Sequence, residues 1–111
     1  MTEKVFQTQL LTVATWYGWH AQHTRPAQYR NGRWATPIQG KPGFPDLVLC
    51  HRTRGLIFVE LKSKTGRLSD AQREWLDLLE AAGQECYVWR PDDFQTAADR
   101  LGGYPPERMT P

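Results

Sequence analysis

Two short apolar runs near the middle of the chain predict a β-hairpin. Residues 47–50 (Leu-Val-Leu-Cys) and 56–59 (Leu-Ile-Phe-Val) are apolar, and the five residues between them are polar and end in Gly55. Apolar runs of this length, joined by a short polar loop that contains glycine, are typical of two antiparallel strands. If the loop is centred on Thr53, position 46 pairs with position 60 and their side chains lie on the same face of the sheet.

Helical periodicity precedes and follows this hairpin. Residues 3–17 carry apolar side chains at helical spacing, and Thr2 is a suitable N-cap for a helix there. Ser69 and Gln72 have the spacing of a capping box, which predicts a second helix over residues 70–82. The expected apolar stripe of this second helix consists of Ala71, Trp75, Leu78, Leu79 and Ala82.

The remaining segments complete an α/β pattern. Residues 86–90 predict a third strand and residues 91–101 a short final helix, while residues 20–45 predict an irregular loop with a tight turn at 30–33 joining two short strands. The order is helix, loop, strand, strand, helix, strand, helix, which predicts a mixed β-sheet of about three strands flanked by helices. The third strand follows a crossover helix, so we expect it to lie parallel to the second.

The length and composition fit a single compact domain. The chain has 111 residues, 40% of them hydrophobic, which is enough for a core. We expect residues 1–103 to form this domain and residues 104–111, which are rich in proline, to form a flexible tail. No segment approaches the ~20 apolar residues of a membrane span, and the first residues lack the pattern of a signal peptide, so cytoplasmic residence is the expectation.

The cysteines and histidines do not suggest a metal site. Cys50 and Cys86 lie in apolar, strand-like runs, so we expect buried, reduced thiols, and two cysteines provide neither a zinc spacing nor a disulfide framework. His20 and His23 are expected to be surface residues or substrate contacts and not metal ligands, because carboxylate ligands are available elsewhere in the chain.

Charge is distributed unevenly along the chain. The net charge is only +2, but residues 4–45 contain no Asp or Glu, and their basic side chains are interleaved with Trp and Tyr. Basic side chains neutralise phosphates and aromatic rings stack on exposed bases, so this segment favours a nucleic-acid partner. The alternative is a solvated basic loop whose aromatic residues turn into the core. The candidate phosphate contacts in this segment are Arg25, Arg30, Arg33 and Lys41.

Asp46, Glu60 and Lys62 form the candidate chemical site. The predicted hairpin places the two carboxylates opposite each other, and Lys62 shares the face of Glu60 because it lies two residues further along the strand. Opposed carboxylates repel each other, and a bound Mg²⁺ or Mn²⁺ ion would offset this repulsion. Lys62 could then position or deprotonate an attacking water. The alternative is a solvated strand face on which Glu60 and Lys62 partly neutralise each other.

Three stretches of sequence resemble a known nuclease family. These stretches are residues 43–48 (Gly-Phe-Pro-Asp-Leu-Val), 58–62 (Phe-Val-Glu-Leu-Lys) and 66–72 (Gly-Arg-Leu-Ser-Asp-Ala-Gln), followed by Gly83. Together they closely resemble the VRR-NUC domain of the PD-(D/E)XK nuclease superfamily, in particular its stand-alone, phage-type members. The resemblance covers nearly the whole chain and is strongest over residues 43–90. The Gly-Arg-Leu-Ser-x-x-Gln block makes it specific, because the PD-(D/E)XK pattern alone has many chance matches.

The resemblance implies a fold, an activity and a substrate. It implies a restriction-endonuclease-like core, a Mg²⁺- or Mn²⁺-dependent phosphodiesterase without organic cofactor, and DNA as substrate. Small members of the family are similar to Holliday junction resolvases, which act as homodimers on branched DNA. Carried over by motif, Asp46 and Glu60 would be metal ligands, Leu61 would offer its backbone carbonyl, and Lys62 would be the catalytic lysine. Glu3 is the only acid in the first helix that could add a further ligand.

Three more polar residues lie beside this motif. Gln72 matches a polar family position near the site, and it also fits the capping box, so one side chain could serve both roles. Lys64 and Arg67 are candidate phosphate contacts, with plain solvated charge as the alternative. The leading hypothesis is therefore a metal-dependent DNA endonuclease. A non-catalytic nucleic-acid-binding module with the same fold, and a structural domain within a phage or chromosomal assembly, are the competing hypotheses.

Overall fold

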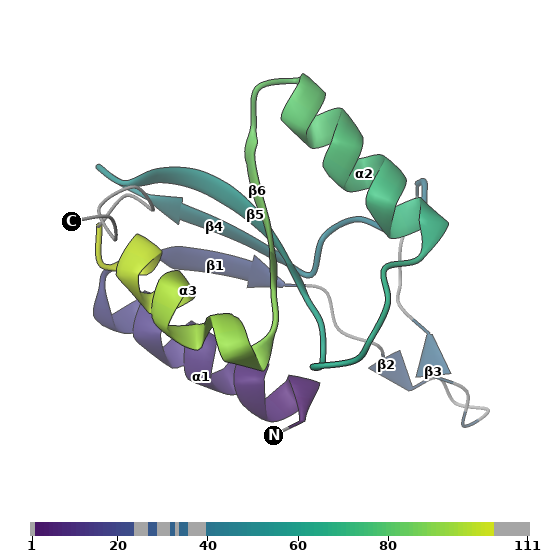
Figure 1. Cartoon of the computed structure of the whole chain (residues 1–111), viewed down its shortest axis with the longest axis horizontal. Coiled ribbons are helices and arrows are strands. Elements are labelled where there is room, and N and C mark those ends of the chain that lie inside the picture. The colour runs from purple at the N-terminus through teal and green to yellow at the C-terminus, as the bar shows by residue number, and fades with distance from the viewer. Residues whose placement is uncertain (1, 24–26, 29–31, 33, 36–39, 104–111) are drawn as a thin grey trace.

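The chain folds into a four-stranded sheet with helices on both of its faces (Figure 1). The computed structural model describes residues 2–23, 27–28, 32, 34–35 and 40–103. In chain order the elements are α1 (Glu3–Trp16), β1 (His20–His23), β2 (Ala27–Gln28), β3 (Trp34–Ala35), β4 (Leu47–His51), β5 (Gly55–Leu61), α2 (Asp70–Ala81), β6 (Glu85–Trp89), a 3-10 turn (Pro91–Asp93) and α3 (Phe94–Leu101). Helices α1 and α3 lie together on one face of the sheet, and α2 lies on the other. The predicted α/β class with a mixed sheet is confirmed.

The central hairpin has the predicted register. Strands β4 and β5 are antiparallel, and Leu47 pairs with Val59, as a loop centred on Thr53 requires. Strand β6 returns through α2 and pairs in parallel with β5, which confirms the predicted crossover connection. The strand order in the sheet is β1-β4-β5-β6, so the hairpin occupies the two central positions.

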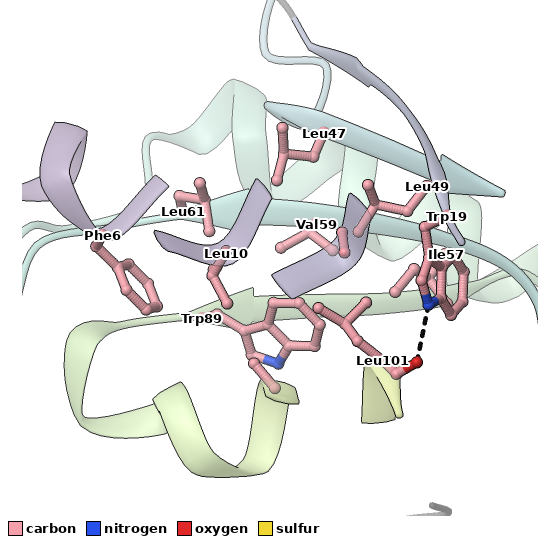
Figure 2. Close-up of a cluster of buried hydrophobic side chains, with 12 residues drawn as sticks. Phe6, Leu10, Trp19, Leu47, Leu49, Ile57, Val59, Leu61, Trp89 and Leu101 are labelled. Carbon is pink, nitrogen blue, oxygen red and sulfur yellow. Dashed lines mark hydrogen bonds between the residues drawn. The ribbon is translucent and has the colours of Figure 1, made fainter. Parts of the chain in front are cut away.

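The main core lies between the sheet and the α1–α3 layer (Figure 2). Alternate residues of the hairpin point to this face, and they meet α1 through Phe6 and Leu10 and α3 through Leu101. Trp19 closes one end of the core, where its indole N–H donates to the carbonyl of Leu101 at 2.9 Å. The hairpin residues buried in this core are Leu47, Leu49, Ile57, Val59 and Leu61. Because these odd-numbered positions face the core, the even-numbered ones, including Asp46, Glu60 and Lys62, face the side of α2.

Three short strands, β1, β2 and β3, lie within the segment 20–45 that was predicted as an irregular loop. The prediction of an irregular loop was wrong for β1, which joins the main sheet as an edge strand and pairs His23 with Leu47. Three of the four side chains of β1 are exposed, and its sequence does not alternate between apolar and polar residues. The sequence pattern therefore did not predict this strand. The short strands β2 and β3 do pair, as predicted on either side of a tight turn, most of which lies outside the described residues.

Helix α2 begins as predicted but turns a slightly different face to the sheet. Its capping box is present, with the Ser69 hydroxyl accepting from the Gln72 N–H at 3.1 Å. The buried leucine is Leu76, whereas Leu78, which was expected in the apolar stripe, is 59% exposed. The helix has leucines at positions 76, 78 and 79, which do not all lie on one side. Periodicity alone therefore could not predict which of them packs against the sheet.

The two cysteines are free thiols, but the prediction that they are buried was wrong. Cys50 is exposed and Cys86 is half-buried. Cys50 is an even-numbered residue of β4, so it points away from the main core, like Val48 and Asp46. None of the described helices is long and apolar enough to cross a membrane. The predicted tail over residues 104–111 lies outside the described residues.

Candidate active site

The hairpin brings Asp46 and Glu60 together at the end where β4 begins and β5 ends. They occupy the next pair of positions after Leu47 and Val59 in the antiparallel register, so their side chains share one face. The Asp46 carboxylate accepts a hydrogen bond from the Leu61 backbone N–H at 2.8 Å, which holds it against the end of β5. Glu60 is 2% exposed, although it carries a carboxylate. The predicted proximity of the two acids is confirmed.

Lys62 directly follows β5 and completes this group at the same end of the strand. Its backbone N–H donates to the carbonyl of Trp89 at 3.1 Å, so the chain is still tied to β6 at this residue. Its ammonium nitrogen lies 4.0 Å from Glu60 Oε2, and its side chain is 15% exposed. A cation buried this deeply beside a carboxylate is unlike a solvated strand face, on which both charges would extend into water.

Gln72 forms the predicted capping box and also contacts Glu60, while its part in catalysis stays a prediction. Its Oε1 accepts from the Ser69 N–H at 2.9 Å, which completes the capping box. Its Nε2 donates to Glu60 Oε2 at 3.0 Å. The capping geometry therefore orients the amide, and the free end of that amide reaches the buried carboxylate.

The environment of Glu60 favours its protonated form. Burial, and then the neighbouring Asp46 carboxylate, raise the pKa of Glu60 from 4.5 to about 8, and the charge of Lys62 opposes this rise. Within the described residues, Glu60 Oε1 is buried without a hydrogen-bond partner. A buried acceptor without a donor, next to a second carboxylate, fits a hard cation such as Mg²⁺, which often takes one or two carboxylates and completes its shell with water and phosphate.

The pKa of Glu60 makes the stability of the metal-free protein depend on pH. Between pH 4.5 and about 8 the folded state holds a proton on Glu60 that the unfolded chain has released. The free energy of unfolding should therefore fall as pH rises through this window, by several kcal/mol. Urea unfolding in EDTA at a series of pH values measures this slope. A free energy of unfolding that stays constant or rises over the window would contradict it.

Comparisons with known proteins identify the family. The model of the VRR-NUC domain matches residues 21–92, more than half of the chain. The chain belongs to the VRR-NUC domain family. A solved structure described as a VRR_NUC domain protein matches with a TM-score of 0.57 and 20% identity, covering 96% of this chain and 94% of that chain, which shows a shared fold. No curated protein matches the sequence. The VRR-NUC family is a nuclease-type family, so membership supports a nuclease function in general.

Glu3 is the predicted further ligand of this VRR-NUC domain. Glu3 is exposed, and its charge makes the smallest contribution to the raised pKa of Glu60. The described residues contain no group of three or more His, Cys, Asp or Glu side chains that could hold an ion, so Glu3 does not complete such a group. Its role as a metal ligand, and that of the Leu61 carbonyl, stay predictions.

The predicted phosphate contacts are only partly described. Lys64 and Arg67 are exposed on the loop that follows Lys62, so they are free to meet a phosphate backbone. Lys41 forms a surface ion pair with Glu74 at 2.7 Å, which anchors its segment to α2. Arg25, Arg30 and Arg33 lie outside the described residues. Of the two histidines, His20 is exposed on β1 and His23 is half-buried with an Nδ1 that has no partner within the described residues.

Sequence reasoning missed Arg90, which holds the loop after Lys62. One guanidinium nitrogen of Arg90 donates to the carbonyl of Ser63 at 2.7 Å and to that of Gly66 at 2.6 Å. These two bonds span residues 63–66 and connect the loop to the end of β6. The only signal in the sequence is a basic residue directly after a strand, which does not reveal carbonyl partners more than twenty residues away.

Replacing Arg90 should loosen this loop. Arg90→Met keeps an apolar stem but leaves the Ser63 and Gly66 carbonyls without their donor, which should cost about 1–3 kcal/mol in the free energy of unfolding. Arg67→Met is the matched control, because Arg67 is an exposed arginine in the same loop. Urea unfolding and hydrogen exchange of residues 63–67 measure the effect. Equal stability of the two variants would show that the Arg90 bonds contribute nothing.

Proposed function

We propose that this VRR-NUC domain is a Mg²⁺- or Mn²⁺-dependent DNA endonuclease of the PD-(D/E)XK type, which hydrolyses phosphodiester bonds in branched DNA. The observation that carries this proposal is the buried Glu60, which faces Asp46 and leaves its Oε1 without a donor in the described part of the chain. Burying the Glu60 carboxyl group beside the half-buried Asp46 carboxylate is costly, so a role in holding a cation explains their retention better than a structural role does.

Each residue has a distinct part in this proposal. Asp46 and Glu60 would hold the ion, with the Leu61 carbonyl as a further ligand, and Gln72 would orient the Glu60 carboxylate through the 3.0 Å hydrogen bond. When bound, the ion would supply Lewis-acid activation of the scissile phosphate and of the attacking water. Lys62, close to Glu60 and largely buried, would place a positive charge where negative charge develops on the phosphate.

The choice of DNA as substrate and the preference for branched DNA rest on different supports. Lys64 and Arg67 offer exposed positive charge next to the acids, which suits a phosphate backbone of any DNA. The choice of branched DNA and of a homodimer rests on the resemblance to junction resolvases, in which two symmetric cuts require two symmetric sites.

A cleavage panel tests this proposal. Labelled four-way junction, flap, single strand and linear duplex are each incubated with Mg²⁺, Mn²⁺ or EDTA, using wild-type protein and Lys62→Ala. We expect cleavage in Mg²⁺ or Mn²⁺ but not in EDTA, fastest on a branched substrate, and lowered by about 100-fold or more in Lys62→Ala. Arg52→Ala is the control, because Arg52 is an exposed basic residue in the loop between β4 and β5, at the other end of the hairpin from the two acids.

Two results would overturn the proposal. Cleavage that survives in EDTA, or an unchanged rate in Lys62→Ala, would exclude the proposed use of the metal or of the lysine. DNA binding without any cleavage, over the whole panel, would instead support the alternative of a non-catalytic nucleic-acid-binding module. Light scattering of the protein with and without a four-way junction tests the expected homodimer.

A further inference from the structure

Phe44 is a half-exposed aromatic residue at the edge of the candidate active site. It lies two residues before Asp46, and at ~3.3 Å per extended residue this places the two residues within about 7 Å of each other along the chain. Its side chain is 39% exposed. Part of this ring therefore stays accessible to a ligand at the edge of the site.

Two other aromatic residues hold the Phe44 ring in a fixed orientation. The Trp75 ring lies 5.1 Å from it, centroid to centroid, at an interplanar angle of 84°. The Phe58 ring lies 6.1 Å away at 87°. Trp75 is itself held, because its indole N–H donates to the carbonyl of Lys41 at 3.1 Å. Edge-to-face packing on two sides orients the ring of Phe44 without burying it.

The elements that hold Phe44 are those that carry the site. Phe58 and Glu60 project from the same face of β5, and Trp75 lies one helical turn after Gln72 on α2. The position of the Phe44 ring is therefore tied to that of the carboxylates, as a substrate contact requires. The loop that follows Lys62 carries Lys64 and Arg67, whose exposed positive charge suits the phosphate backbone.

We infer that Phe44 is a stacking site for a nucleobase next to the scissile phosphate, and that it selects DNA in which this base is unpaired or unstacked. This inference rests on the proposed nuclease function and names the feature of the substrate that the site prefers. The flat face of a base is the group that stacks on a fixed aromatic ring, and such stacking is tolerant of base identity. A base inside a continuous duplex is already stacked on its neighbours, so only a base at a branch, flap or single-stranded end is free to reach Phe44.

An abasic scan of the substrate tests the inference. Single abasic sites are introduced at each position around the branch point of the substrate that binds best, and binding is measured by fluorescence anisotropy with the full chain carrying Lys62→Ala in Mg²⁺, so that the substrate stays intact. We expect one position at which loss of the base weakens binding by about 10-fold. Phe44→Leu should weaken binding of the intact substrate by a similar factor, and the abasic site should add nothing further in that variant. In the active protein the same change should raise KM more than it lowers kcat.

Two controls separate stacking from packing. Phe44→Tyr keeps a flat ring and should bind like the parent protein. Leu56→Ala removes an equally exposed apolar side chain, 40% exposed, at the far end of β5 and should not affect binding. Thermal unfolding of each variant checks that Phe44→Leu is folded, and the abasic scan itself needs no variant at Phe44.

The outcomes are distinguishable from those of the nuclease test. If no abasic position weakens binding, or if the losses from the abasic site and from Phe44→Leu multiply, Phe44 does not stack on a base and the inference is overturned. If wild-type protein cuts none of the substrates but the scan shows one sensitive base that is lost with Phe44→Leu, the nuclease proposal fails while the stacking site stands.

Discussion

Glu60→Gln should lower metal-dependent cleavage by about 1,000-fold or more, and it should also make the metal-free protein more stable near pH 8. The loss of activity follows from the loss of a charged oxygen ligand, which an amide oxygen replaces poorly for a hard cation. We expect this combination, a loss of activity with a gain in stability, when a residue is retained for chemistry and not for folding.

The gain in stability has a specific physical origin. Near pH 8 the wild-type protein must either hold a buried carboxylate or keep a proton that the unfolded chain has released, because burial and then Asp46 raise the pKa of Glu60 to about 8. A glutamine carries no charge to desolvate, can still accept from Gln72, and can donate to Asp46 through its amide, so it should raise the free energy of unfolding by about 1–3 kcal/mol. At pH values near 5, where Glu60 is protonated in the folded state, the two proteins should differ little.

Three measurements check this prediction. Cleavage of the preferred substrate gives the rate, calorimetric titration with Mn²⁺ gives the affinity for the ion, and urea unfolding in EDTA near pH 5 and pH 8 gives the stability. Glu80→Gln is the matched control, because it makes the same chemical change on the exposed side of α2. A Glu60→Gln variant that still cuts at the wild-type rate, or that is less stable than wild type at both pH values, would contradict the proposed role of Glu60.

Gly43→Ala should destabilise the protein by about 3 kcal/mol. Two effects add at this position. The backbone of Gly43 has a φ of +98°, which costs an L-residue roughly 1–2 kcal/mol. A Cβ atom there would also lie 2.5 Å from the carbonyl carbon of Ala71 and 2.6 Å from its oxygen, and this overpacking costs a further ~1–3 kcal/mol. The clashing atoms are backbone, so they cannot rotate away as a flexible side chain would.

The same substitution should also impair the site. Ala71 precedes Gln72 in the first turn of α2, so pushing Ala71 outward moves the amide of Gln72 away from Glu60. Asp46 lies three residues after Gly43 and would be displaced as well. We therefore expect slower cleavage in addition to lower stability, even at temperatures at which the variant stays folded.

Gly83→Ala is the matched control for Gly43→Ala. Gly83 lies at the other end of α2 with a φ of +86°, but a Cβ there would meet nothing within 4 Å. Gly83→Ala should therefore lower the free energy of unfolding by only about 1 kcal/mol, which is the cost of the backbone conformation, and it should leave cleavage intact. Urea unfolding and cleavage assays of both variants measure the difference. If the two variants lose equal stability, the close approach of Gly43 to α2 does not contribute.

Local pattern was sufficient to predict the hairpin, its register and the capped start of α2. The apolar runs around Thr53 specify which residues face each other, because side chains alternate strictly along a strand. The capping box of Ser69 and Gln72 depends on residues only three positions apart. The same local rules placed Asp46, Glu60 and Lys62 on one face before any tertiary contact was considered.

Only long-range packing produced the remaining features. The pairing of β1 with β4 joins exposed polar residues to a strand about 25 positions away, and backbone hydrogen bonds leave no trace in side-chain pattern. The stripe of α2 shifted to Leu76 because the docking of the helix, and not its periodicity, selects the buried face. The bonds from Arg90 to the loop after Lys62, and the burial that raises the pKa of Glu60, also arise only when sheet and helix come together. Residue types and local spacing were therefore enough to predict the chemical groups of the site. The desolvated environment of these groups arises only from the packing of the helices against the sheet.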